Sequence, residues 1–136
     1  MFLTDIRDFD HRPYIVDGEI VRDRVVLEGN IVWLDVKNDK EYTVPKGFVF
    51  DLASLPWWTG WALTKLGKHQ RAAALHDWFY VNRINTKAWS DAQFRLAMAD
   101  DGVAGWRKYM AWSGVALCGW PAWWSKDEII IVEEDT

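Results

Sequence analysis

The first third of the chain consists of short apolar runs that end at turn-forming residues, a pattern typical of β-strands. We predict strands over residues 19–27, 31–36, 41–44 and 48–50. The first two are rich in β-branched side chains, and Glu28-Gly29-Asn30 lies between them as a turn signal. The pattern therefore predicts that these two strands pair as a β-hairpin.

After Pro56 the apolar positions take on helical spacing. Residues 70–81 favour a helix strongly, because they contain three consecutive alanines, the residue with the highest helix propensity. Ser90 is expected to cap the N-terminus of the next helix, with Gln93 completing a capping box. Gly102 is expected just past the end of that helix.

These elements predict an α+β fold, with a small antiparallel sheet packed against a cluster of three to four helices. No repeat or linker divides the chain, so residues 1–136 are expected to form a single domain. Residues 1–50 are expected to be mainly β and residues 56–120 mainly α. The apolar run IIIV predicts a terminal strand within residues 128–133 that rejoins the N-terminal sheet.

Charge is unevenly distributed along the chain, whose net charge is −4. Residues 47–126 contain 5 acidic and 9 basic side chains, whereas residues 127–136 contain 5 acidic side chains and no basic one. The negative total argues against nonspecific nucleic-acid binding, and no nucleic-acid partner is expected. The basic middle favours an anionic ligand, although scattered solvated charges are the simpler interpretation. The start of the chain lacks a basic, apolar signal peptide, so a cytoplasmic origin is expected.

Tryptophan is unusually abundant: ten of the 11 tryptophans lie between Trp57 and Trp124. Tryptophan marks packed cores, contact surfaces and membrane interfaces. The uncharged stretch Tyr109–Trp124 would be about 24 Å long as a helix, which is short for a membrane span. A buried helix is the simpler interpretation, and docking on a bilayer surface or on a partner protein is the alternative.

His76 is the leading candidate for a functional residue. On a helix it shares one face with Ala72, Leu75 and Phe79, so the imidazole lies on an apolar stripe. A buried imidazole needs a partner for each ring nitrogen, and a metal, a carboxylate or a backbone carbonyl would serve. The pattern leaves open whether His76 is functional or a satisfied core histidine.

Four further polar residues accompany His76, namely Asp51, Ser54, Asp77 and Asp91. Asp91 shares a helical face with Phe94, so its carboxylate points toward the core. Each residue also has a structural explanation: surface pairing for Asp77, the helix dipole for Asp91, and turn or helix capping for Asp51 and Ser54.

The five residues are compatible with two chemistries. In the first, one divalent ion (zinc, manganese or iron) activates a water molecule and is held by Asp51, His76, Asp77 and Asp91. In the second, Ser54, His76 and one aspartate form a nucleophile–base–orienter triad, although Ser54 lacks a Gly-x-Ser-x-Gly elbow. All five are therefore catalytic candidates.

Three motifs resemble those of a family of uncharacterised proteins from tailed phages and prophages. They are residues 44–56 (VPKGFVFDLASLP), residues 71–80 (RAAALHDWFY) and residues 90–94 (SDAQF), followed by Gly102-Val103 and an aromatic-rich helix. The resemblance implies a phage origin but no reaction, and the chain departs from the family pattern in its many tryptophans and its acidic tail. The His-Asp dipeptide followed by a later Asp is also similar to metal-dependent phosphohydrolases of the HD type.

Three functions fit these observations, and they leave open whether the protein is an enzyme. The first is a small metal-assisted hydrolase of cell-wall peptide or amide bonds or of a phosphoester. The second is a virion structural or assembly accessory protein (tail or capsid), with a buried polar network and a Trp-rich surface that contacts other phage proteins. The third is a membrane-surface protein acting through Tyr109–Trp124. The expected location is the host cytoplasm during infection, with the virion as the alternative.

Overall fold

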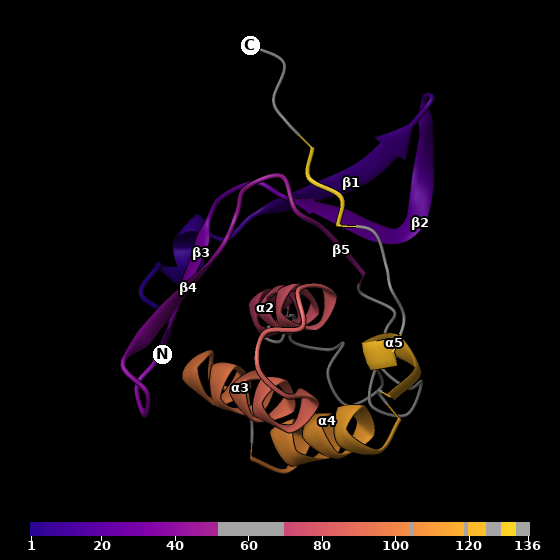
Figure 1. The fold of residues 1–136 in the computed structure, drawn as a ribbon. Helices are drawn as coiled ribbons and strands as arrows, with labels where there is room; N and C mark the ends of the chain where they lie inside the picture. The colour runs from indigo at the N-terminus through magenta and orange to yellow at the C-terminus, as the bar shows by residue number, and fades with distance from the viewer. Residues whose placement is uncertain (52–69, 104, 119, 125–128, 133–136) are drawn as a thin grey trace.

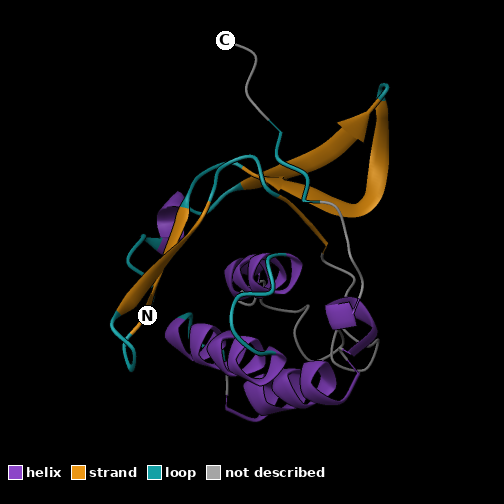
Figure 2. Ribbon diagram, viewed as in Figure 1, coloured by secondary structure: helices purple, strands orange, loops and turns teal. Residues whose placement is uncertain are grey.

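The computed structural model describes residues 1–51, 70–103, 105–118, 120–124 and 129–132 (Figure 1, Figure 2). Its elements, in chain order, are the 3-10 turn η1 (Ile6–Asp8), the strands β1 (His11–Val16), β2 (Glu19–Leu27), β3 (Ile31–Asp35), β4 (Lys40–Val44) and β5 (Val49–Asp51), and the helices α2 (Gln70–Val81), α3 (Lys87–Asp100), α4 (Gly105–Cys118) and α5 (Trp120–Trp124). The strands curl around α2, and α3 and α4 lie on the side of α2 away from the strands (Figure 1). The predicted α+β class is confirmed, and a single domain stays a prediction.

The strands pair differently from the prediction. β2 lies between β1 and β5, whereas β3 pairs with β4, and all these pairs are antiparallel. The hairpin predicted for residues 19–36 is therefore wrong. The partner of β2 is β1, joined to it by Asp17 and Gly18, whose φ angles of 51° and 80° suit a type I′ turn. Pro13 within β1 obscures that strand in the sequence, because proline is confined to strand edges and bulges.

The β3–β4 hairpin supplies part of the strand surface that faces the helices. Ile31 lies opposite Val44, and Trp33 lies opposite Tyr42. Along β3 the side chains alternate between buried and partly buried, as expected for a strand with one face on the core. The ring centroid of Tyr42 lies 5.2 Å from that of Phe79 on α2, in an edge-to-face contact.

Helix α2 occupies the predicted range, and its apolar stripe is buried. Ala72, Leu75 and Phe79 are fully enclosed, in one cluster with Trp33 and Phe50 from the strands. Burying side chains of this size contributes about 1.5–3 kcal/mol each. The stripe therefore fixes which face of α2 turns toward the strands.

Helix α3 begins at a different cap from the one predicted. Thr86 is the N-cap, and its hydroxyl accepts a hydrogen bond from the Trp89 amide at 3.1 Å. Ser90 is instead buried within the helix, where its hydroxyl donates to the Ile84 carbonyl at 3.4 Å. Both residues offer a capping hydroxyl. The left-handed φ of 58° at Asn85 interrupts the helical backbone conformation just before Thr86, so the helix begins after Thr86.

The end of α3 follows the prediction. Gly102 has a φ of 79° and donates to the Ala99 carbonyl, while the Val103 amide donates to the Met98 carbonyl at 2.9 Å. These two bonds define a Schellman motif, which satisfies carbonyls that the helix leaves unpaired.

The helices are layered rather than gathered on the sheet. α2 contacts β3, β4 and β5, and α3 reaches the strands through Trp89, which lies 5.3 Å from Tyr42. α4 packs on α3, and α5 packs on α4 and α2. The sequence predicted three to four helices against the sheet. In the described residues, the side chains that contact the strands come from two helices, α2 and α3. None of the helices in the described ranges is long and apolar enough to span a membrane.

The predicted terminal strand is reduced to an isolated bridge. Ile131 pairs with Phe48, and the Val132 amide donates to the Gly47 carbonyl at 2.8 Å; residues 128 and 133 lie outside the described residues. Gly47 has a φ of 91°, and a Cβ there would lie 2.1 Å from the Val132 carbonyl oxygen. Glycine is thus required at residue 47 both by the backbone conformation and by the close approach of the chain end.

We predict that Gly47→Ala lowers the free energy of unfolding more than Gly18→Ala does. Both glycines have positive φ, which costs a non-glycine residue about 1–2 kcal/mol, but a Cβ at Gly18 meets nothing within 4 Å. Urea denaturation of the two variants measures the difference. Equal losses of unfolding free energy would mean that the Val132 backbone does not restrict the side chain at residue 47.

Candidate functional site

Three donors converge on the buried carboxylate of Asp91. His76 Nε2 lies 2.8 Å from Asp91 Oδ1, and the Tyr80 hydroxyl donates to the same oxygen at 2.5 Å. Lys87 Nζ donates to Asp91 Oδ2 at 2.7 Å. The Asp91 residue is only 2% exposed, so the charge depends on these partners for its solvation.

Helical periodicity places the four residues together. His76 and Tyr80 are one turn apart on α2, and Lys87 and Asp91 are one turn apart on α3. The two helices pack side by side, which brings the pairs face to face. The His76 ring is held between Tyr80 and Phe94, at centroid distances of 4.1 and 4.7 Å.

Burial and hydrogen bonding set the charge of each group. Burial lowers the pKa of His76 and the bond to Asp91 offsets this only in part, so the imidazole is neutral near pH 7. Burial acts to raise the pKa of Asp91, but hydrogen bonds from His76, Lys87 and Tyr80 outweigh it and hold that pKa below its usual value. Burial and the bond to Asp91 raise the pKa of Tyr80, so its phenol stays a donor. The cluster therefore holds one anion and one cation.

A cavity of about 490 Å³ opens beside this cluster. Its lining includes Lys87 and Asp91 together with the rings of Trp112, Trp120 and Trp123. Lys87 Nζ also donates to the Ala116 carbonyl at 3.1 Å and lies 4.9 Å from the centre of the Trp120 ring. The cavity therefore combines aromatic walls with an ion pair, as is typical of ligand pockets.

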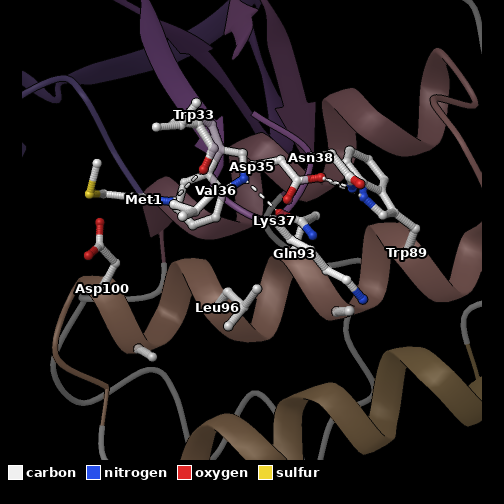
Figure 3. A pocket seen from close by; sticks show the side chains of 13 residues that line it. Met1, Trp33, Asp35, Val36, Lys37, Asn38, Trp89, Gln93, Leu96 and Asp100 are labelled. Carbon is white, nitrogen blue, oxygen red and sulfur yellow. Dashed lines mark hydrogen bonds between the residues drawn. The ribbon is translucent and has the colours of Figure 1, made fainter. Parts of the chain in front are cut away.

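A second cavity, of about 800 Å³, lies on the other side of α3, against β3 (Figure 3). Its buried polar groups are already paired: Asp35 accepts hydrogen bonds from Asn38 and Trp89, at 2.7 and 3.1 Å. Gln93 accepts one from the Trp33 indole at 2.9 Å. Burial acts to raise the pKa of Asp35, but the bonds from Asn38 and Trp89 lower it overall. These polar side chains thus hydrogen-bond one another where β3 packs against α3, which is a structural role.

The structure brings two of the five predicted site residues into contact, His76 and Asp91. Asp77 is half-buried, one residue after His76 on α2. Asp51 ends β5, but its side chain lies outside the described residues, as does the whole of Ser54. The triad through Ser54 therefore stays a prediction.

The predicted metal site also stays a prediction. Within the described part of the chain, no group of three or more His, Cys, Asp or Glu side chains is placed to hold a metal. Both carboxylate oxygens of Asp91 already accept hydrogen bonds, one of them from the Lys87 ammonium. A cation bound to Asp91 would be repelled by that ammonium group.

Two members of the cluster, Tyr80 and Lys87, were missed from the sequence. The signal was available, because each lies four residues from a predicted site residue on the same helix. Arg71, which with Arg83 was an alternative surface partner for Asp77, does not lie on the surface. It is buried, and its guanidinium pairs with the Asp101 carboxylate and donates to the Thr4 carbonyl at 2.8 Å.

The fold and site define an α+β protein with a buried His–Asp pair between two helices. The chain belongs to the family described as "Protein of unknown function (DUF1353)", which matches residues 26–115. The matched range contains α2, α3 and all four residues of the Asp91 cluster. Comparisons with curated proteins and with solved structures found no match.

We predict that the protein loses stability as the pH falls from about 7.5 to 5.5, and that His76→Gln removes part of this loss. The folded state keeps His76 neutral below the ordinary imidazole pKa of about 6.5, so there the unfolded chain binds a proton that the folded chain does not. The slope from one such group is at most about 1.4 kcal/mol per pH unit. Urea midpoints across this range measure it, and identical slopes in both proteins would contradict the burial of a neutral His76.

Proposed function

We propose that this protein is a small hydrolase in which neutral His76 acts as a general base toward a water molecule. The observation that carries the proposal is the 2.8 Å contact between His76 Nε2 and the buried carboxylate of Asp91. An oriented, uncharged imidazole with a carboxylate behind it is the arrangement that activates water or hydroxyl nucleophiles.

The contact also fixes which nitrogen would act. An ionised carboxylate only accepts hydrogen bonds, so the proton of the neutral ring lies on Nε2. The lone pair is then on Nδ1, to which no described residue donates a hydrogen bond. Asp91 and the flanking rings of Tyr80 and Phe94 act as positioning residues for that lone pair.

The proposed reaction is hydrolysis of a carboxylic ester. His76 Nδ1 takes a proton from water as the water oxygen forms a bond to the carbonyl carbon. The carbon–oxygen bond to the leaving group then breaks, and the leaving alkoxide takes the proton from the imidazolium. The products are a carboxylic acid and an alcohol, and Asp91 stabilises the transient positive charge on His76 without itself taking the proton.

The surroundings of the site favour an uncharged ester over the phosphoester expected from the sequence. The cavity beside Asp91 is walled by Trp112, Trp120 and Trp123. Lys87 is the one cation among its described lining residues, and its charge is paired with Asp91. A phosphoester would bring negative charge into this aromatic cavity, where the described lining residues offer it no cation other than Lys87.

We predict that His76→Gln lowers hydrolysis of p-nitrophenyl butyrate by about 100-fold or more, because glutamine cannot act as a base. The matched control is His11→Gln: His11 Nε2 also lies 3.0 Å from a side-chain oxygen, that of Gln70, away from Asp91. Both variants are first checked for cooperative unfolding.

An unchanged rate in folded His76→Gln would refute His76 as the base. Wild-type protein without activity on this ester, on a nitroanilide or on bis-p-nitrophenyl phosphate would refute the hydrolase. Addition of zinc, manganese or iron to each assay tests the metal-assisted form of the proposal.

A second candidate is a virion or assembly accessory protein of tail or capsid. The observation that favours it is the saturation of Asp91 by His76, Tyr80 and Lys87, which is what a network joining α2 to α3 requires. This second proposal includes a phage origin for the protein. It also places the protein in the host cytoplasm or in the virion. Detection of the protein in purified virions, combined with no hydrolysis, would support it over the first.

A further inference from the structure

The outer face of α4 and α5 carries a stripe of exposed apolar side chains. Tyr109, Leu117, Trp120 and Trp124 are 52, 76, 44 and 67% exposed. Tyr109, Leu117 and Trp120 are eight and three residues apart, so they lie along one side of α4 and its junction with α5. Helix α4 lies on the side of α3 away from α2 and the strands (Figure 1).

Cations are placed around these rings. The guanidinium of Arg95 and the ammonium of Lys108 both lie 5.5 Å from the centre of the Tyr109 ring. Arg83 is exposed and donates to the carbonyls of Trp123 and Trp124 at the end of α5. The face thus has aromatic side chains with positive charge beside them, the combination that favours an interface with anionic lipid headgroups.

The apolar stripe continues into the cavity beside Asp91. Trp120 is a wall of that cavity, and its ring packs in a tilted arrangement against exposed Trp124, at a centroid distance of 5.3 Å. Leu117 follows Ala116, another residue of the cavity wall. An apolar chain could therefore pass from the outer face to the cavity along the described side chains of Leu117, Trp120 and Trp124.

We infer that the α4–α5 face docks on a bilayer that contains anionic lipids. Resting on the proposed function, this makes esters of membrane lipids the substrate class, with the acyl chain entering between Trp120 and the rest of the cavity wall. A soluble acidic protein would match the charges but would not account for the two most exposed apolar side chains of this face, Leu117 and Trp124. A bilayer accommodates both features.

We predict that the wild-type protein co-sediments with vesicles of phosphatidylglycerol and phosphatidylcholine, and less with phosphatidylcholine alone. The double variant Leu117→Ser/Trp124→Ser is expected to bind about tenfold or more weakly, since two apolar side chains are lost from the contact. Its control is Ile20→Ser/Val36→Ser, which removes two side chains that are 69 and 66% exposed on the strand side of the molecule.

The inference would be overturned if the wild-type protein bound neither kind of vesicle, or if both double variants lost vesicle binding to the same extent. Binding to soluble polyglutamate with the same loss in Leu117→Ser/Trp124→Ser, but not to vesicles, would assign the face to an acidic protein and also overturn it. The proposed function fails separately. Hydrolysis of p-nitrophenyl butyrate without vesicle binding would support the proposed hydrolase and overturn the docking on lipid. Vesicle binding without hydrolysis would support the docking on lipid and refute the hydrolase.

Discussion

The packing of the helices depends on the ion pair between Asp91 and Lys87. His76 and Tyr80 complete it with hydrogen bonds to the same carboxylate. A carboxylate that is 2% exposed carries a large desolvation cost, and three short hydrogen bonds from two helices offset it. Removing one partner would leave a buried charge unpaired, which typically costs about 3–5 kcal/mol. The cluster thus fixes how α2 and α3 sit against each other, and through the Ala116 carbonyl it extends to α4. The aromatic cavity is a consequence of that packing, because its walls come from the segments that Lys87 and Asp91 hold in place.

Local signals in the sequence were sufficient for the elements with strong periodicity or unambiguous end signals. Helix α2 follows from its alanines and its apolar stripe, and the end of α3 follows from Gly102. Pairing between strands was not predictable in the same way, because Glu28-Gly29-Asn30 and Asp17-Gly18 both favour turns and only tertiary packing decides which closes a hairpin. The start of α3 failed for a similar reason: Thr86 and Ser90 both offer capping hydroxyls, and burial of Ser90 selects Thr86.

The candidate site was half visible in the sequence. The apolar stripe placed His76 inside, and the face shared with Phe94 placed Asp91 inside, but their contact depends on how two helices pack. Tyr80 and Lys87 were overlooked despite their four-residue spacing from His76 and Asp91, because tyrosine and lysine are ordinary surface residues of helices and only a buried carboxylate makes them members of a site. The same geometry adds a second interpretation to the chemistry that the sequence suggested: with both oxygens of Asp91 accepting hydrogen bonds, the proposal gives this carboxylate the role of orienting the imidazole. Together with the exposed aromatic face of α4 and α5, the cluster supports an account in which water is activated beside an apolar cavity that opens toward a lipid surface.

The central claim of this account is that His76 is a neutral base whose proton lies on Nε2 and whose lone pair lies on Nδ1. Nitrogen-detected NMR of the protein labelled with ¹⁵N-histidine reports the protonation of each ring nitrogen directly, and a His76→Gln sample assigns the signals. The account predicts a single His76 tautomer, protonated at Nε2 and not at Nδ1, that persists as the pH falls below the ordinary imidazole value of about 6.5. A His76 protonated on both nitrogens at neutral pH, or on Nδ1 alone, would contradict it.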